Sequence, residues 1–405
     1  MRNIFVNISN AIKSQDRKAQ LRLLLWGSIV VFLVLLALGR FHVSHVDIDT
    51  DTYITAGKNY FAGIMDRERT PVYPVIYHMA CLFGNTVGEY IIVLLQELVF
   101  LCSVVFLYRA VRMVFPERNI TTFIVVALYA WNPAIVQYQL LIMTESLALS
   151  ASALLLYLMC KGILQQFTLR NAVALAVLYL FMLFLRPFFI CFAPLLVLFY
   201  LFARKHMALP ATGVFWAGIA ITFVAYLGYC GMFQRQYGVF TTSSVADINL
   251  NAQLYESGIT PDAIWKADTF DLKQEHDHNR RLLMGHKGIW FKHMVSETFL
   301  SGRQLYPSIN LQYGGKVSQM FSWQVPLAGL YIATLLFVLI AIYRWRKGHD
   351  MRLELMVAMI ILTTAFTAVW GAFSSYSRLV LPCYPCACLM VGYYASLLRI
   401  TTRRQ

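Results

Sequence analysis

Residues 23–38 read LLLWGSIVVFLVLLAL, a stretch without a single charged side chain. A helix needs about 20 predominantly apolar residues to cross the hydrocarbon layer of a bilayer. Comparable apolar blocks recur along the chain, most clearly at Tyr90–Leu107 and Val325–Ile342. The 405-residue sequence is 59% hydrophobic and 13% charged, whereas an ordinary soluble domain has roughly 25% charged residues. The sequence therefore predicts an all-α polytopic membrane protein and excludes a soluble enzyme.

Ten membrane spans are expected, at residues 23–39, 89–108, 120–137, 145–161, 171–185, 188–203, 212–232, 324–343, 353–372 and 379–398. Short connections rich in Lys and Arg alternate with connections that include two long segments of mixed charge. Short basic connections stay on the cytoplasmic side. We therefore expect both termini in the cytoplasm, a basic segment over 1–22 and one membrane domain over 23–405. Its two outer loops would be residues 40–88 and 233–323.

Both outer loops are expected to carry helices that lie at the membrane interface. In the first loop, residues 53–64 have apolar residues at helical spacing. Residues 71–83 are apolar but too few to span, which fits either an interfacial or a re-entrant helix. In the second loop the expected helices are 262–265 and 286–299. Arg186 and Pro187 divide a long apolar run, and Pro does not continue a helix readily, so this pair predicts a tight outer turn.

The net charge of +14 and the eight Cys residues do not indicate a nucleic-acid surface or a disulfide framework. The cations lie in connections between apolar blocks, where they set membrane orientation. Cys383, Cys386 and Cys388 have a zinc-like spacing, but no second set of ligands accompanies them. No metal site is assigned on this basis.

Three carboxylates, Asp47, Asp49 and Asp51, follow the first span closely. Alternate residues of an extended segment point the same way. Neighbouring carboxylates repel one another unless they are solvated, bind a metal or take part in proton transfer. A solvated loop, a divalent-cation site and an acid–base group are all consistent with this pattern, and the sequence leaves open which of the three Asp residues would be the base.

Arg69, Arg186 and Arg378 are expected at the same depth, near the outer face of the membrane. Each alone fits a cation that reaches from apolar surroundings to the interface. Together with the acidic loop, they fit an anionic lipid headgroup and an acid–base group. Glu145 opens the fourth span, where a carboxylate also fits the simpler role of a helix cap.

In their order and topology these motifs resemble the GT-C superfamily of membrane glycosyltransferases. The resemblance is closest to the bacterial family 39-like group, which is similar to dolichyl-phosphate-mannose-protein mannosyltransferases. It rests on four short runs of residues: Asp49-x-x-x-Tyr53, Arg69-Thr70-Pro71-Val72-Tyr73-Pro74, Thr144-Glu145-Ser146 and Arg378-x-x-x-Pro382-x-x-Pro385.

The resemblance implies a GT-C-like fold and a hexosyl or pentosyl transferase. Such an enzyme would move a sugar from a polyprenyl-phosphate donor to a lipid, glycan or protein acceptor at the periplasmic face of the bacterial inner membrane. Asp49 would be the catalytic base, with Asp51 as the runner-up. Arg69, Tyr73, Tyr53, Glu145, Arg186 and Arg378 would bind the donor phosphate or sugar. No cofactor is implied, although the acidic loop is compatible with a divalent cation.

A transporter or flippase for a lipid-linked glycan is an alternative, as is a polymerase or ligase of such glycans. Transporters commonly place charges at mid-membrane on broken helices and contain inverted repeats. Here the charges are expected at the outer interface and no internal repeat is visible, which favours the enzyme.

Overall fold

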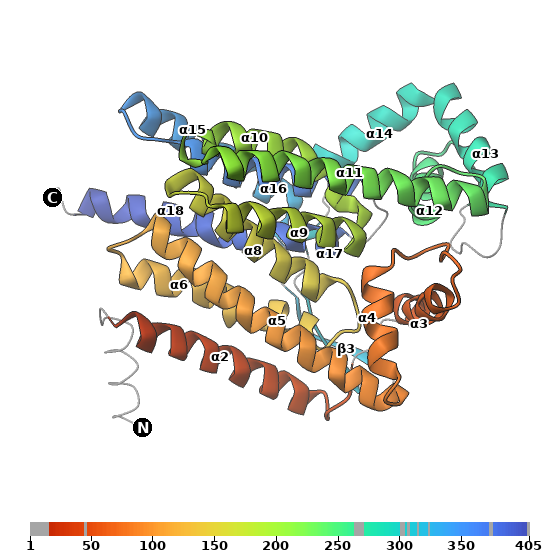
Figure 1. The fold of residues 1–405 in the computed structure, drawn as a ribbon, viewed down its shortest axis with the longest axis horizontal. Helices are drawn as coiled ribbons and strands as arrows, with labels where there is room; N and C mark the ends of the chain where they lie inside the picture. The colour runs from red at the N-terminus through yellow and green to blue at the C-terminus, as the bar shows by residue number, and fades with distance from the viewer. Residues whose placement is uncertain are drawn as a thin grey trace.

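The computed structural model describes residues 16–43, 47–262, 271–299, 304–305, 308–313, 316–322, 325–371 and 376–402. Within these ranges the chain forms an elongated bundle of long helices that run side by side (Figure 1). Smaller helices gather at one end of the bundle, which the sequence predicts to be the outer end.

Eight described helical segments are long and apolar enough to cross a membrane. They are α2 (Arg17–Leu38), α5 (Asn85–Val114), α8 (Glu145–Leu164), the run of η2 (Pro187–Phe192), α10 (Ala193–Ala203) and η3 (Arg204–His206), α11 (Leu209–Tyr237), α15 (Leu327–Arg346), α16 (Arg352–Gly371), and the segment Arg378–Ser396. This last segment comprises parts of α17 (Tyr376–Val380) and α18 (Tyr384–Thr402), with η5 (Leu381–Cys383) between them.

Two further apolar segments complete the bundle. Helix α6 (Asn119–Ala130) continues into α7 (Pro133–Val136) and the 3₁₀ helix η1 (Gln137–Gln139) after a bend of 44°. Helix α9 (Leu169–Leu185) has only 17 residues. These two segments and the eight long ones coincide with the ten predicted spans, which confirms an all-α polytopic membrane protein. Helix α9 ends immediately before Arg186 and η2 begins at Pro187, so the predicted turn is also confirmed.

The first helix begins earlier than the predicted span, within the basic segment expected over residues 1–22. Asp16 precedes α2, and its Oδ1 accepts hydrogen bonds from the backbone N–H groups of Lys18 at 2.9 Å and Ala19 at 3.3 Å. Such a cap satisfies donors that the first turn of a helix otherwise leaves unpaired. Helix α2 therefore starts at Arg17.

The outer loops contain more structure than their apolar patterns predict. Loop one carries α3 (Asp47–Phe61) and α4 (Val72–Cys81), so the first helix starts before residue 53. Loop two carries α12 (Val245–Glu256), α13 (Leu272–Gly285) and α14 (Lys287–Phe299). Of the helices expected there, α14 is confirmed and the one at 262–265 lies mostly outside the described residues.

Four short strands precede α15 and were not predicted. Strand β1 (Gln304–Leu305) pairs antiparallel with β4 (Val325–Pro326), and β2 (Ser308–Tyr313) pairs antiparallel with β3 (Lys316–Ser322). As a result α15 begins at Leu327, slightly later than the predicted span.

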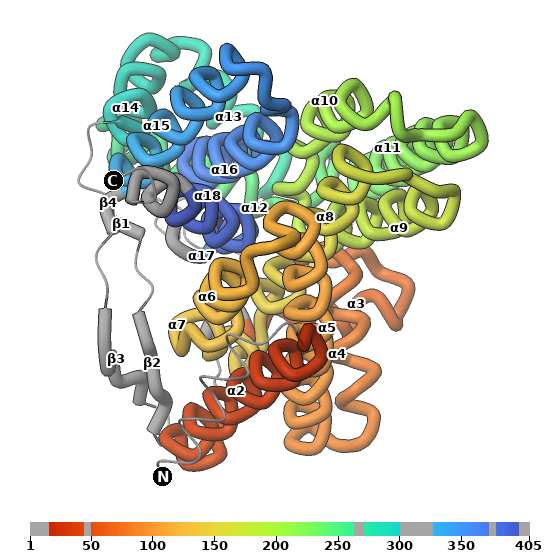
Figure 2. Tube along the Cα trace, turned by 90° about the vertical axis from the view of Figure 1, so that its left-hand side faces the viewer, coloured from red at the N-terminus to blue at the C-terminus, as the bar shows by residue number. Residues whose placement is uncertain are grey.

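Helix α8 forms the centre of the bundle, between α5, α9, α10 and α18 (Figure 2). In its most apolar window 78% of the residues are buried, against 22% for α2, α11 and α15. Its buried Ala148, Ala151 and Ser152 have small side chains, which allow neighbouring helices to approach closely. The N-terminal end of α8 is consequently a fixed point for the elements around it.

The close approach of α9 and α11 can be tested at Gly218 of α11. A Cβ at this position would lie 2.3 Å from the Cβ of Ala176 in α9, whereas a Cβ at Gly213 of the same helix would meet nothing within 4 Å. We expect Gly218→Ala to separate α9 from α11 and lower the free energy of unfolding by about 1–3 kcal/mol. Gly213→Ala is the matched control, and equal stability of both variants in detergent unfolding would contradict the close approach.

Candidate functional site

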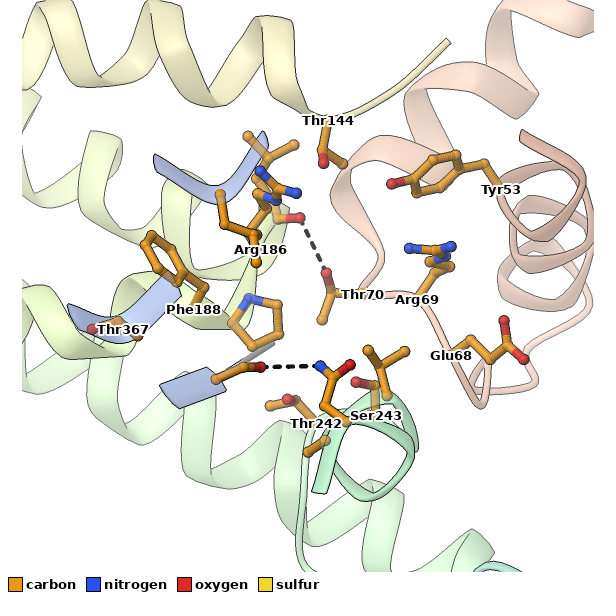
Figure 3. Close-up of a pocket in the computed structure, with 17 residues that line it drawn as sticks. Tyr53, Glu68, Arg69, Thr70, Thr144, Arg186, Phe188, Thr242, Ser243 and Thr367 are labelled. Atoms are coloured by element: carbon orange, nitrogen blue, oxygen red, sulfur yellow. Dashed lines mark hydrogen bonds between the residues drawn. The ribbon is translucent and has the colours of Figure 1, made fainter. Parts of the chain in front are cut away.

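A cavity of about 260 Å³ opens among the loop helices at the end of the bundle (Figure 3). One side is formed by α3 and the segment before α4, and the other by the α9–η2 junction, α12 and the end of α16. Its polar lining residues are Tyr53, Glu68, Arg69, Thr70, Thr144, Arg186, Thr242, Ser243, Asn249 and Thr367. Tyr53, Arg69 and Arg186 were predicted as site residues, and the structure brings all three to this cavity.

Two arginines share one carboxylate beside the cavity. Glu145 is the first residue of α8 and its side chain is fully buried. Its Oε1 accepts from Arg186 Nη2 at 3.1 Å and from Arg378 Nε at 2.8 Å. The N-terminus of a helix favours a negative charge, so the carboxylate is stabilised from both sides. Arg186 lines the cavity, whereas Glu145 and Arg378 do not. Glu145 pairs with both arginines and so connects Arg378 to the cavity wall.

One donor of this cluster has no partner in the part of the chain described. Nη1 of Arg186 is buried and has no hydrogen-bond partner within the described ranges. A buried donor left unpaired is costly. An anionic ligand in the cavity would satisfy this donor.

Arg69 lies on the opposite side of the cavity. Its Nε donates to Thr52 Oγ1 at 2.8 Å, and its guanidinium lies 4.6 Å from the centre of the Tyr53 ring. In Figure 3 the side chains of Arg69 and Tyr53 lie next to each other on the loop-one side, across from Arg186. Two cations thus border the same space from different elements.

Asp66 holds the segment that carries Arg69. Its Oδ1 accepts from the backbone N–H groups of Glu68 at 2.9 Å and Arg69 at 2.8 Å, and its Oδ2 accepts from Asn59 at 2.9 Å. Tyr60 donates to the carbonyl of Arg69 and lies 2.7 Å from the hydroxyl of Tyr229 in α11. Burial and the nearby Tyr229 raise the pKa of Tyr60 far above its usual value, so its hydroxyl remains a donor.

Tyr73 does not line the cavity but supports its wall from behind. Its ring packs edge-on against Tyr53 at 4.8 Å, and its hydroxyl donates to Gln96 Oε1 at 2.9 Å. Gln96 in turn donates to the carbonyls of Gln139 and Leu141, each at 2.9 Å. This buried network fixes the non-helical segment that leads into Glu145.

Loop two contributes a wall of uncharged donors that sequence reasoning missed. Thr242, Ser243 and Asn249 line the cavity, and Asn249 Nδ2 also donates to the carbonyl of Gly371 at 3.0 Å. The backbone N–H of Ser244 donates to the carbonyl of Arg67 at 2.8 Å, which joins the two loops. No motif marks these residues in the sequence, because hydroxyl and amide side chains are common in polar loops.

Behind this wall, Asp247 of α12 pairs with His276 of α13. Asp247 Oδ1 lies 2.8 Å from His276 Nδ1, and the Asp247 side chain is 5% exposed. Burial raises the pKa of Asp247 above its usual range, and the hydrogen bond and charge of His276 offset part of this effect. The pair fixes α12, whose first residues line the cavity.

The acidic cluster is only partly placed by the structure. Helix α3 begins at Asp47, so position 49 lies in its first turn, but the side chains of Asp47 and Asp49 lie outside the described residues. Asp51 is exposed and does not line the described cavity. Among the residues described, no group of three or more His, Cys, Asp or Glu side chains could hold a metal ion.

The bundle is similar to two solved structures of an archaeal enzyme. One is the oligosaccharyltransferase AglB from Archaeoglobus fulgidus in complex with an inhibitory peptide and a dolichol-phosphate, with a TM-score of 0.54 and 13% identity over 96% of this chain and 52% of that one. The other is an Archaeoglobus fulgidus oligosaccharyltransferase tethered to an acceptor peptide, with a TM-score of 0.51 and 11% identity over 92% of this chain and 49% of that one.

These likenesses show the fold and no more, because the sequence identities are low. The chain spans about half the length of the solved structures that it matches. Comparison with family models and with curated protein sequences finds no match. The shared architecture agrees with the predicted bundle of membrane-spanning helices.

Because two arginines share the carboxylate of Glu145, we expect Glu145→Gln to lower the free energy of unfolding strongly. The change would leave two partly buried guanidinium groups without their shared carboxylate. Loss of one partner of a fully buried ion pair costs roughly 3–5 kcal/mol, so we expect a loss toward the lower end of that range. Asp277→Asn on the exposed face of α13 is the control, and a surface change of this kind stays within about 0.5 kcal/mol. Similar thermal midpoints for the two purified variants would show that the cluster is not a structural support.

The Asp247–His276 pair predicts a pH-dependent effect of Asp247→Asn. A carboxyl whose folded pKa is raised makes the folded state less stable as pH rises through that pKa. Asn keeps an acceptor for His276 without the buried charge. We therefore expect Asp247→Asn to be more stable than the unaltered protein at neutral pH, and the difference to vanish as pH falls toward 4. Thermal midpoints across this range measure it, and a variant that is less stable at neutral pH would contradict the expectation.

Proposed function

We propose that the chain is a membrane glycosyltransferase of the GT-C class that takes a sugar from a polyprenyl-phosphate donor. One observation carries the proposal: Arg69 and Arg186 border one cavity from opposite sides, and Arg186 retains a buried donor without a partner within the described ranges. Guanidinium groups pair well with phosphate oxygens. The fold adds support, since one solved structure of similar architecture contains a dolichol-phosphate.

The two sides of the cavity suit the two parts of such a donor. The phosphate belongs between the guanidinium groups, and the sugar hydroxyls belong against Thr242, Ser243 and Asn249. Drug-sized ligands occupy pockets of roughly 300–1,000 Å³, so a cavity of about 260 Å³ fits one sugar with its phosphate better than a long glycan. The preferred donor is therefore a hexosyl or pentosyl phosphate on a polyprenyl chain.

In the proposed reaction Asp49 takes the proton of the acceptor hydroxyl or amine. The nucleophile attacks the anomeric carbon, the bond from that carbon to the phosphate oxygen breaks, and polyprenyl phosphate leaves with the bonding electrons. Arg69 and Arg186 stabilise the negative charge that develops on the leaving group. Position 49 is one helical turn before Tyr53 in α3, and Tyr53 lines the cavity. Positions four apart in a helix are surface neighbours.

We place this reaction at the periplasmic face of a bacterial inner membrane, with both termini cytoplasmic. The basic connections support that orientation. The resemblance to the family 39-like group supports the host and the enzyme type, and the acceptor is a lipid, glycan or protein. The acceptor peptide tethered in one solved structure of similar fold supports a protein as one of these acceptors.

A transporter of a lipid-linked glycan is the second candidate, and two structural observations favour it. The third span is bent by 44°. Glu97 lies within the α5 span with both carboxylate oxygens buried and unpaired in the part of the chain described. Ionisable groups inside spans commonly mark transport pathways. In proteoliposomes without an acceptor, such a protein would move the labelled lipid-linked sugar across the membrane, whereas the enzyme would leave it in place.

Asp49→Asn tests the catalytic assignment. Loss of a general base slows a reaction by about 10²–10⁴-fold, so we expect a loss of this size in sugar transfer from a panel of polyprenyl-phosphate-linked hexoses and pentoses. Asp51→Asn, two positions along the same helix, should retain most activity. Transfer at the unaltered rate by a folded Asp49→Asn protein would refute the assignment.

A further inference from the structure

A second cavity lies at the end of the bundle opposite the candidate site. It has a volume of about 240 Å³ and is lined by Val114, Phe115, Pro116, Glu117, Arg118, Arg344, Tyr393 and Ser396. A neighbouring cavity of about 170 Å³ shares Val114, Arg344 and Tyr393 with it. The ends of α5, α15 and α18 and the start of α6 enclose this space, which lies at the end of the bundle away from loops one and two (Figure 1).

The cavity is lined by the guanidinium groups of Arg118 and Arg344, which suit an anionic ligand. Arg118 Nη1 donates to the carbonyl of Ser396 at 3.0 Å. Arg344 Nη1 donates to Glu354 Oε1 at 2.9 Å, and its guanidinium lies 5.9 Å from the centre of the Tyr393 ring. A guanidinium has five N–H donors. Most donors of both arginines therefore have no protein acceptor within the described ranges.

The acidic groups nearby are paired with other cations or face solvent. Asp350 in the smaller cavity is engaged by Arg352, with Nη2 and Oδ2 2.6 Å apart. Glu354 is engaged by Arg344. Glu117 is exposed at the edge of the larger cavity, where water screens its charge. Among the described residues, Arg118 therefore forms no direct ion pair with a carboxylate.

The cavity lies at the depth of lipid headgroups. Arg344 is near the end of the α15 span, and Ser396 is the last residue of the final span. Tyr343 and Trp345 on α15 are 64% and 60% exposed. Exposed aromatic residues at span ends are typical of the membrane–water interface. Basic pockets between span ends on the cytoplasmic side bind anionic headgroups.

We propose that this cavity binds the phosphate of an anionic phospholipid, with Arg118 and Arg344 as donors. The site is separate from the cavity of the proposed glycosyl transfer and does not depend on that function. A phosphodiester would accept the remaining N–H groups of both arginines, and its acyl chains would extend along the exposed apolar surface of α15. Lipid binding there would hold the ends of α5, α6, α15 and α18 together.

Titration with phosphatidylglycerol tests the proposal. The full-length protein in phosphatidylcholine nanodiscs should show a rise in thermal midpoint as phosphatidylglycerol is added, because a ligand that binds only the folded state stabilises it. Arg118→Gln should weaken the apparent affinity at least about tenfold. Arg109→Gln, an exposed cation near the same end of α5, should weaken it by no more than about fivefold, the effect of one surface cation near an anionic membrane.

Glu117→Gln provides a test that poor folding cannot imitate. Removing this carboxylate from the cavity edge should tighten phosphatidylglycerol binding about two- to fivefold, as for a partly exposed charge pair. Unchanged or weaker binding would overturn the proposal, as would equal losses for Arg118→Gln and Arg109→Gln. Inorganic phosphate alone should give no shift. A shift equal to that of the lipid would identify a free-phosphate site instead.

Discussion

The carboxylate of Glu145 is the constraint on which the outer half of the structure depends. It is the first residue of the most buried helix, and through one oxygen it holds Arg186 at the end of α9 and Arg378 in α17. A buried carboxylate with two cationic partners is stable only when all three groups keep their positions. Oε1 of Glu145 thus links α8, α9 and α17, and Arg186 of this cluster lines the cavity.

Around this point the two outer loops are joined to each other rather than resting separately on the bundle. Residues 65–67 of loop one bond to Gln236 and Tyr237 of α11 and to Ser244 of loop two. Asn249 and Gln253, four apart in α12, donate to the last carbonyls of α16 at Gly371 and Trp370, each at 3.0 Å. A movement of either loop would therefore break these hydrogen bonds or displace the other loop and the end of α16.

The sequence predicted the spans well because span length and charge placement are local properties. It also predicted that Arg69, Arg186 and Arg378 lie at one depth, since topology alone indicates this. It did not predict α12 or the wall of Thr242, Ser243 and Asn249, because their placement depends on polar contacts with residues more than a hundred positions away, such as Arg67 and Gly371. The paired strands, whose partners lie at most 22 positions apart, were also not predicted. Glu97 was hidden inside an apolar block, and only its burial without a partner in the described ranges makes it conspicuous.

The short helix α9 has a consequence for the bilayer itself. At about 1.5 Å per residue, its 17 residues extend about 26 Å, less than the roughly 30 Å of hydrocarbon in a typical membrane. A short hydrophobic element is matched by local thinning of the lipid around it. Because α9 ends at Arg186, the headgroup layer would be drawn inward beside the cavity. The phosphate of a lipid in that leaflet would then lie at the depth of Arg186.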